Sequence, residues 1–463
     1  SELHERFAAW LERVAADRLV EYEEIIAYHL EQAYRYRAEL GPPDEHAREL
    51  ALRAGTLLAD SGERADSRAD VAATVDLLAR AAELLPEDLP RRRRLLYILG
   101  IRSYDGGDGP RAEQILTDAI ADADRAGDQG ASALAELALL AVRLSTRSLE
   151  MSESVRETER LAAILARVGD EAGARLAQAW GAFFLFAMGK AGQATRRAQA
   201  LVELGEGNEM WQREARMARG VSLVFGPTPV DEAVAELQSH IDRAASSAWT
   251  IGANHGIARL RALQGQFAEA RERSARSLAA FEELGNRQQV ASVIGSDGVI
   301  EHMLGNYAEA ARLIRQSFDA MIAIGDQSFA STIAVGLGDA YLDLHQDEEA
   351  WRFGTIARDT SSTDDVASQA GGRAIQARVL SRRGDHDAAE ALAREAAAIM
   401  AATDYLDQHA DVLVHLARVL QEAGKADEAV AAAHEAVALY DQKGASFFVE
   451  RTQRLIGEWT ANG

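Results

Sequence analysis

Cysteine is absent from this 463-residue chain, which excludes disulfides, thiolate metal ligands and thiol catalysis. Proline is scarce, and none of the seven follows Pro229, so the second half of the chain offers long helices no obstacle. Long apolar runs are also missing. The most apolar stretch, AWGAFFLFAM at 179–188, is about half the roughly 20 residues that a membrane helix needs. With a charged N-terminus unlike a signal peptide, we expect a cytoplasmic protein without a membrane segment.

The charge is strongly negative, with 73 acidic against 50 basic residues and a formal net charge of -23. Such a chain repels phosphate backbones, so we expect no nucleic-acid partner. The simplest interpretation of the acidic residues is a solvated surface that keeps an alanine-rich protein soluble. A docking surface for a basic partner is the alternative.

Motifs for catalysis are missing as well. The only lysines are Lys190, Lys425 and Lys443, and the Gly-Lys pairs among them lack the Ser/Thr and upstream glycine of a P-loop. The sequence contains no GxSxG, HExxH or EF-hand pattern. We therefore expect this chain to be no enzyme and to hold no cofactor or metal.

What the sequence does contain is a repeat. A small-residue anchor recurs about every 40 residues, and one degenerate unit near Ser154 fills the longest gap. The anchors are Ala72, Ala112, Ala194, Ala233, Ala270, Ala310, Ala350, Ala389 and Ala429. A fixed period of two-helix length predicts stacked αα-hairpins.

The clearest unit runs from Gln288 to Gly325. Its apolar residues have helical spacing, Gly305 and Asn306 break the pattern, and a second helix follows. Gly298 and Ala310 are expected where the two helices approach closely, because larger side chains would separate them. The predicted fold is all-α: an α-α superhelix, a right-handed solenoid of about ten hairpins.

The units resemble tetratricopeptide repeats. The matching features are Leu99-Gly100, Leu337-Gly338 with Tyr341, and glycines at the turns between paired helices: Gly107, Gly189, Gly265, Gly305, Gly384 and Gly424. The spacing exceeds the family's 34 residues and no proline closes the units, which implies longer helices. We expect irregularities near 145–154 and 226–229, where the superhelix changes its path.

The N-terminal segment differs from the repeats. The runs LHERFAAWLE (Leu3–Glu12) and YEEIIAYHLEQAYRY (Tyr22–Tyr36) resemble the segment that follows the winged helix in bacterial signalling ATPases of the STAND class. Many of these ATPases carry class III adenylyl or guanylyl cyclase domains. The resemblance implies that residues 1–60 are a helical arm coupled to an upstream ATPase domain and that residues 61–463 are the repeat solenoid. The absence of an initiator Met agrees with a piece of a longer protein.

The binding surface expected from this resemblance lies on the first helix of each hairpin, which lines the concave groove. Counting from Gly298, the next residue maps through the array to Ile101, Arg143, Phe183, Ser222, Arg259, Val299, Asp339, Arg378 and Arg418. Three residues further, the row includes Phe186, Phe225 and His302. Because a shift of one residue rotates a position by about 100°, these assignments depend on the frame.

Two patterns in these rows point to binding. Phe183, Phe186 and Phe225 form a predicted aromatic patch, and Arg259, Arg378 and Arg418 place cations in the groove of an acidic protein. Such arginines suit an anionic ligand. The full set of ligand-binding candidates is Phe183, Phe186, Phe225, His255, Arg259, His302, Asp339, Arg378 and Arg418. The alternatives are that the aromatics are core residues, that the arginines pair with neighbouring acids such as Asp339, and that the histidines are simply packed or solvated.

The leading functional hypothesis is a non-catalytic sensor or scaffold that binds a protein, peptide or small inducer in its groove. The alternative is a constitutive self-association module. The last predicted helix carries Phe447, Phe448, Leu455, Ile456 and Trp459, and it either caps the core or mediates a homodimer.

Overall fold

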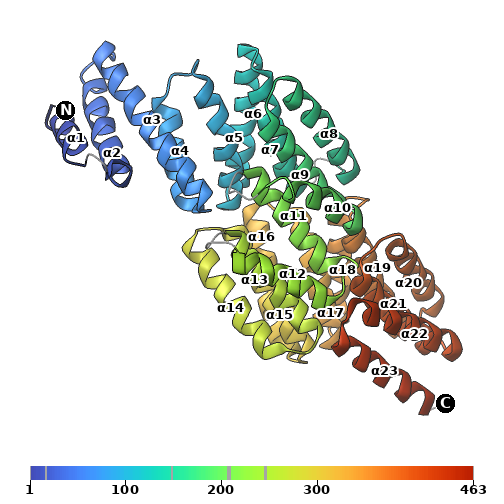
Figure 1. The fold of residues 1–463 in the computed structure, drawn as a ribbon. Coiled ribbons are helices and arrows are strands. Elements are labelled where there is room, and N and C mark those ends of the chain that lie inside the picture. The colour runs from blue at the N-terminus through green and yellow to red at the C-terminus, as the bar shows by residue number, and fades with distance from the viewer. Residues whose placement is uncertain (1, 16–17, 147–149, 206–209, 244–247, 462–463) are drawn as a thin grey trace. The chain divides into compact units, whose positions relative to one another are not determined.

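The computed structural model describes residues 2–15, 18–146, 150–205, 210–243 and 248–461. Within them the chain forms twenty-three α-helices and no β-strand (Figure 1). The helices are α1 (Glu2–Ala15), α2 (Leu19–Ala38), α3 (Glu45–Ser67), α4 (Val71–Leu84), α5 (Pro90–Asp105), α6 (Gly109–Ala126), α7 (Gln129–Thr146), α8 (Met151–Arg167), α9 (Glu171–Ala187), α10 (Ala191–Val202), α11 (Met210–Phe225), α12 (Val230–Arg243), α13 (Ala248–Leu263), α14 (Phe267–Glu283), α15 (Arg287–Met303), α16 (Tyr307–Ile324), α17 (Gln327–Asp343), α18 (Asp347–Thr360), α19 (Val366–Arg382), α20 (His386–Ala401), α21 (Leu406–Glu422), α22 (Ala426–Lys443) and α23 (Ser446–Ala461). The predicted all-α fold of stacked helical hairpins is confirmed. None of the described helices is both long and apolar enough to cross a bilayer.

The chain divides into two compact units. Unit 1 comprises Ser1–Val142, Arg167–Asp170 and Leu284–Asn286, and unit 2 comprises Arg143–Ala166, Glu171–Glu283 and Arg287–Gly463. Helix α3 runs through residue 60, so the division into an arm of 1–60 and a solenoid of 61–463 stays a prediction. Of the predicted irregular stretches, residues 147–149 lie outside the described part, and residues 226–229 form the loop between α11 and α12.

The repeat anchor occupies the same place in each hairpin, in the first turn of the second helix. Its backbone N–H donates to the carbonyl four residues earlier, and its side chain is fully buried. The prediction of Ala72 is wrong: Ala72 is exposed, and Thr74 takes the equivalent position four residues after Asp70. The observed anchors, each 0% exposed, are Thr74, Ala112, Ser154, Ala194, Ala233, Ala270, Ala310, Ala350, Ala389 and Ala429.

Close approach within a hairpin explains the small residues of the first helices. A Cβ on Gly298 would lie 2.5 Å from Cγ1 of Ile314 and 3.1 Å from the carbonyl oxygen of Ala310. The turn glycines predicted from the sequence all have positive φ, between 73° and 91°. At the α17–α18 turn the same conformation falls on His345, with φ of 56°. A side chain with a Cβ rarely adopts this conformation.

Segments five hairpins apart also contact each other, which the sequence did not indicate. In unit 2, both carboxylate oxygens of Asp404 accept hydrogen bonds of 2.7 Å, from the backbone N–H groups of Ala191 and Gly192 at the start of α10. Asp364 accepts equivalent bonds from Met151 and Ser152 at the start of α8, at 3.1 and 2.7 Å. In unit 1, the N–H of Val71 donates to the carbonyl of Leu284 at 3.0 Å. Each pair joins a helix N-terminus to a loop about 213 residues away.

Lys443 makes the next contact of this kind in unit 2. Its fully buried Nζ donates to the carbonyls of Leu223, Gly226 and Thr228, at 3.2, 2.7 and 2.9 Å. These carbonyls belong to the end of α11 and to the loop at 226–229. Burial lowers the pKa of Lys443 to about 8.

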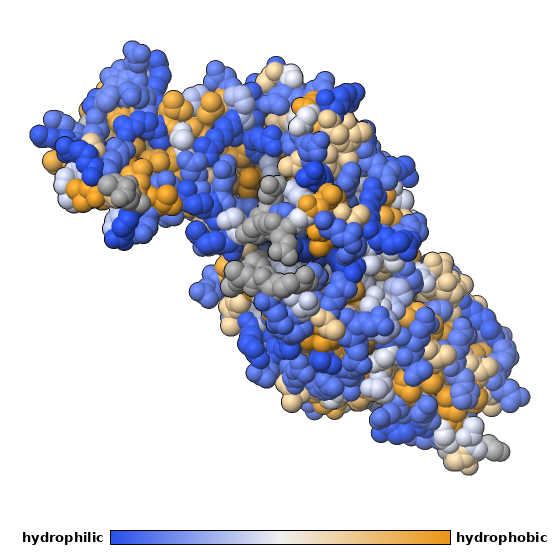
Figure 2. Space-filling model, in the orientation of Figure 1, coloured by the Kyte–Doolittle hydropathy of each residue, from blue (hydrophilic) through white to orange (hydrophobic). Residues whose placement is uncertain are grey.

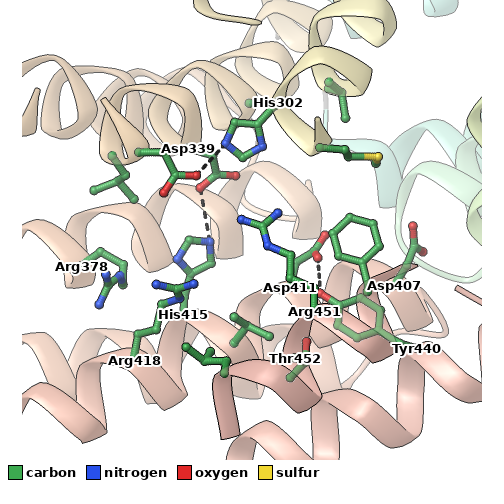
Figure 3. Close-up of a pocket in the computed structure, with 18 of the residues that line it drawn as sticks. His302, Asp339, Arg378, Asp407, Asp411, His415, Arg418, Tyr440, Arg451 and Thr452 are labelled. Atoms are coloured by element: carbon green, nitrogen blue, oxygen red, sulfur yellow. Dashed lines mark hydrogen bonds and ion pairs between the residues drawn. The ribbon is translucent and has the colours of Figure 1, made fainter. Parts of the chain in front are cut away.

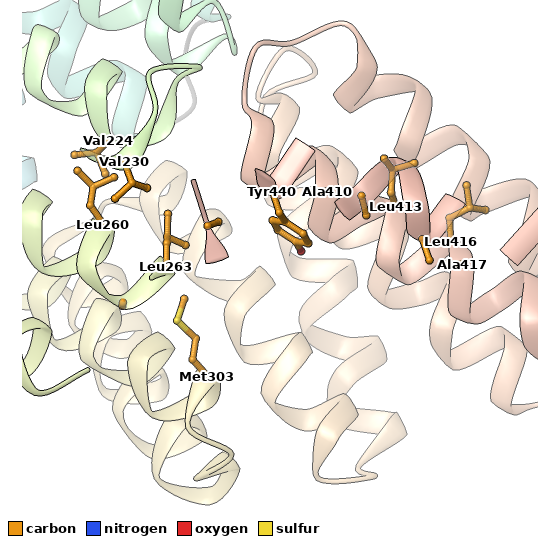
Figure 4. Packing of buried hydrophobic residues seen from close by; sticks show 14 of the residues in the cluster. Val224, Val230, Leu260, Leu263, Met303, Ala410, Leu413, Leu416, Ala417 and Tyr440 are labelled. Carbon is orange, nitrogen blue, oxygen red and sulfur yellow. The ribbon is translucent and has the colours of Figure 1, made fainter. Parts of the chain in front are cut away.

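The apolar core follows the stacked hairpins. Figure 4 shows part of a buried cluster in unit 2, to which Leu260 and Leu263 of α13 and Leu413 and Leu416 of α21 belong. In unit 1, α1 keeps an apolar stripe on its outer face. Leu3, Phe7, Trp10 and Val14 are 41–80% exposed, and Figure 2 shows hydrophobic residues over the N-terminal helices.

Candidate ligand-binding cavity

One cavity of about 190 Å³ lies in unit 2, on the first helices of five consecutive hairpins (Figure 3). We call it the α13–α23 cavity. Its wall contains equivalent residues from α13, α15, α17, α19 and α21, each directly after a buried small residue: Arg259, Val299, Asp339, Arg378 and Arg418. One residue of helix is a rotation of about 100°, so a residue that follows a buried small residue turns toward the inner face. His302, from the second predicted row, also lines the cavity.

One arginine–aspartate ion pair and two histidine–aspartate contacts cross the cavity between helices. Arg259 Nη2 lies 2.6 Å from Asp407 Oδ2, His302 Nε2 lies 2.9 Å from Asp343 Oδ2, and His415 Nε2 lies 3.2 Å from Asp339 Oδ1. Burial acts to raise the pKa of Asp343, but the hydrogen bond with His302 and the positive charges of His302, Arg451 and Arg418 together outweigh it, and the pKa is lowered. The expected pairing of groove arginines with acids thus holds for Arg259, although its partner is on α21 rather than on the next repeat.

Two further arginines of the wall are paired outside it. Arg378 is buried, and its Nη1 donates to Glu422 at 2.7 Å. Arg382 Nη1 donates to Asp347 at 2.7 Å and to the carbonyl of Leu342 at 2.9 Å. Both guanidinium groups are therefore held in place by α17–α18 and by the end of α21.

Arg418 and Arg451 differ from these arginines. Within the described part of the chain, no carboxylate oxygen lies within the 4.0 Å of an ion pair from either guanidinium. Burial lowers the pKa of Arg418, and the positive charges of Arg378 and Arg451 lower it further, whereas the negative charges of Asp343 and Glu422 act in the opposite direction without cancelling the shift. A cation that is desolvated beside other cations is stabilised by an anion, and the described residues place none in contact with it.

Asp411 is an acidic residue of the cavity that, like Arg418 and Arg451, has no ion-pair partner among the described residues. Asp411 is an exposed residue, and desolvation by the protein around its carboxyl group raises its pKa to about 6. The hydroxyl of Tyr440 donates to it, and among the described residues no basic group pairs with it. Three buried atoms nearby also lack a hydrogen-bond partner in the described part: Arg259 Nε, Asp407 Oδ1 and His415 Nδ1.

The C-terminal helix α23 closes one side of the cavity. Phe447 packs edge-on against Phe267 of α14 at 5.2 Å between ring centroids, and Phe448 stacks on Tyr440 at 5.1 Å. Phe448, Arg451, Thr452 and Leu455 line the cavity. Of the two roles predicted for this helix, the structure shows packing on the chain's own core.

The remaining predicted residues lie elsewhere. Phe186 has ring contacts with Phe183 at 6.0 Å and Phe225 at 5.8 Å, so the three aromatics do gather. Phe186 also contacts Tyr405, and both Phe186 and Phe225 pack against a buried cluster that includes residues of α20 and α21. They are partly buried rather than open. This arrangement agrees with the alternative that they are core residues.

His255 does not line the cavity. Burial lowers its pKa to about 4, with a smaller contribution from Arg259. Two positions of the predicted row are wrong as groove residues, because Ile101 and Ser222 are buried. In the described part of the chain, no group of three or more His, Asp or Glu side chains could hold a metal ion.

The fold and the cavity define an α-α repeat protein. The sequence matches no protein-family model, and no curated protein is significantly similar to it. Among solved structures, the chain is similar to a Rap protein complexed with competence and sporulation factor (15% identity, 61% of this chain, 80% of that chain, TM-score 0.43). It is similar to NprR in complex with its cognate peptide NprX (11% identity, 68% of this chain, 85% of that chain, TM-score 0.44). It is also similar to yeast Tom70 (10% identity, 97% of this chain, 96% of that chain, TM-score 0.35). At TM-scores this low, these similarities carry no conclusion about the present chain.

Proposed function

We propose that this chain is a non-catalytic sensor or scaffold domain that binds a protein, peptide or small inducer in the α13–α23 cavity. One observation carries the proposal: equivalent positions of five consecutive hairpins converge on a single cavity. A repeat array binds in this way, because each unit adds one side chain to a continuous inner surface. Cations without ion pairs and buried atoms without hydrogen-bond partners on the same wall support a binding role.

A finer proposal concerns the protein to which this domain belongs. The resemblance of Leu3–Glu12 and Tyr22–Tyr36 to STAND ATPases supports a bacterial signalling protein with an upstream ATPase. The exposed stripe of Leu3, Phe7, Trp10 and Val14 offers such a domain an apolar surface. Ligand binding would then bias an off/on equilibrium, provided that the ligand prefers one state. A winged helix and P-loop domain encoded before Ser1 would support this context, and an unrelated domain would exclude it.

Filling the cavity tests the binding role. Gly336 of α17 lines the cavity, and a Cβ there would make only ordinary contacts of 3.6 and 3.7 Å with Ile314. Gly336→Leu therefore places a side chain in the cavity with no clash at its Cβ. Gly252→Leu on α13, where a Cβ would meet nothing within 4 Å, is the matched control. We expect a displayed library of random linear peptides to yield binders that the control retains and Gly336→Leu loses. Equal binding to both variants would contradict the proposal.

Self-association is the second candidate, and the stripe on α1 is the observation that favours it. Exposed apolar patches of this kind mark interaction sites. Light scattering at two concentrations distinguishes the candidates: a mass that rises with concentration, and that Trp10→Glu returns to the monomer value, supports self-association. A monomer at both concentrations excludes it.

A further inference from the structure

The wall of the α13–α23 cavity is electrically asymmetric along α21. Asp411, His415 and Arg418 follow one another at helical spacing, so they share one face over two turns. In Figure 3, Arg378 and Arg418 lie on one side of the cavity, Asp407, Asp411 and Tyr440 lie on the other, and Arg451 is between them. The cavity thus has a cationic end and an acidic end.

At the cationic end, the opposite charges act from beyond ion-pair distance: Asp343 on Arg418 and Arg451, and Glu422 on Arg418. Glu422 accounts for Arg378, but Arg418 and Arg451 have no carboxylate within ion-pair distance among the described residues. Each guanidinium can form two parallel hydrogen bonds to a carboxylate. Because α23 supplies Arg451 and α21 supplies Arg418, a ligand carboxylate between them would join two helices that are not paired in one hairpin.

At the acidic end, two carboxylate groups have oxygens that no cation contacts among the described residues. Arg259 pairs with Oδ2 of Asp407, whereas Oδ1 of Asp407 has no hydrogen-bond partner in the described part of the chain. Asp411 accepts a hydrogen bond from the neutral phenol of Tyr440. Between the two ends the wall is apolar and includes Val299, Met303 and Val414. A ligand that satisfies both ends carries a positive and a negative group, joined by a short apolar part.

We propose that the α13–α23 cavity binds a small zwitterion, with its carboxylate between Arg418 and Arg451 and its ammonium on Asp411. The class that fits is a free dipeptide or an amino acid of similar length between its charged ends. This proposal rests on the binding role proposed above and narrows it to one chemistry.

Length and volume agree with this class. Asp411 and Arg418 are seven residues apart on α21, which is about 10.5 Å along the axis at 1.5 Å per residue. An extended dipeptide spans about 7 Å, and a hydrogen bond of about 2.9 Å at each end brings its reach to a comparable length. The cavity, at about 190 Å³, is below the roughly 300–1,000 Å³ of pockets for drug-sized ligands.

The test uses the full chain and isothermal titration calorimetry with glycylglycine, alanyl-leucine and leucyl-alanine. Each dipeptide is compared with its N-acetyl form, which lacks the ammonium, and its C-terminal amide, which lacks the carboxylate. We expect at least one free dipeptide to bind and both blocked forms to bind about tenfold to a hundredfold more weakly. Binding by none of the free dipeptides, or equal binding by the blocked forms, would overturn the proposal. So would equal binding of inorganic phosphate, which would indicate an anion site only.

Single substitutions test which residue binds each charged group of the dipeptide. Arg418→Gln should weaken the free dipeptide but leave the affinity for its amide unchanged, because the amide has no carboxylate to lose. Asp411→Asn should spare the N-acetyl form in the same way. Arg312→Gln, at an exposed arginine of α16 paired with Glu309, is the control. If peptides from the display library bind through the cavity while free dipeptides do not, the proposed function stands and the zwitterion site falls.

Discussion

The carboxylate of Asp404 caps a helix whose first residue, Ala191, lies 213 residues earlier in the chain, with an oxygen 2.7 Å from its backbone nitrogen. Helix N-termini are usually capped by the residue directly before them, as Asp385 does for α20. Here the loop after α20 supplies the cap for α10. The N-cap of α10 is therefore a residue that is distant in the sequence, instead of the residue before the helix.

Removing this cap should weaken the helix that it serves. We expect Asp404→Ala to lower the free energy of unfolding by about 1 kcal/mol, with a range of roughly 0.5–2. The particular expectation is faster amide hydrogen exchange at the start of α10. Asp385→Ala is the matched control, because it removes a local cap from α20 and should leave exchange in α10 unchanged. Unaltered exchange in α10 after Asp404→Ala would show that the distant cap contributes nothing.

Lys443 predicts a rise of stability with pH. Its pKa is about 8 in the folded chain and about 10.4 in an unfolded one, so between these values the unfolded state binds more protons. Stability therefore increases as the pH rises from about 8 to about 10.5, by as much as about 3 kcal/mol from this group. Urea denaturation of the wild type and of Lys443→Met measures it. The variant should lose this rise, and identical slopes would show that Lys443 keeps an ordinary pKa.

Two glycines should respond to the same substitution with opposite signs. At Gly298 a Cβ would lie 2.5 Å from Ile314, so Gly298→Ala should destabilise by about 1–3 kcal/mol through overpacking. At Gly252 a Cβ meets nothing within 4 Å, so Gly252→Ala should stabilise the helix by about 0.5–1 kcal/mol. Thermal unfolding of both variants is the measurement. A shift of the same sign in both would refute the packing role of Gly298.

His345 offers a stabilising change. It has φ of 56° at a turn where six other units have glycine and the α3–α4 turn has Ala69, and a left-handed residue with a side chain costs about 1–2 kcal/mol. Glycine also loses more entropy on folding, so the net gain from His345→Gly should be about 0.5–1 kcal/mol. The reverse change, Gly305→Ala, should destabilise. Melting temperatures decide the matter, and a less stable His345→Gly would mean that the imidazole has a packing role.

The sequence predicted those parts of the structure that repeat. Counting from Gly298 placed Arg259, Asp339, Arg378 and Arg418 on one wall, because each follows a small residue that is buried at the same position of its helix. The count failed at Ser222, where the loop at 226–229 changes the phase of α11 and turns this residue into the core.

Residues outside the repeated positions were missed. Asp411 lies on the same face of α21 as Arg418, two helical turns earlier, so its spacing was an available signal. Arg451 gave none, because α23 belongs to no hairpin and its position depends on tertiary packing through Phe447 and Phe448. The caps by Asp364 and Asp404 depend on small rotations added over five hairpins, which no local pattern specifies.

The contacts at a separation of about 213 residues constrain how such a chain can evolve. In a solenoid whose units touch only their neighbours, a hairpin can be duplicated or lost and the array merely changes length. Here, deleting one hairpin between Ala191 and Asp404 would bring a different loop opposite α10, and the same shift would separate Lys443 from its three carbonyls. These contacts therefore all require the same number of hairpins between their partners. Substitutions, rather than gain or loss of repeats, remain the route by which the cavity can change its ligand.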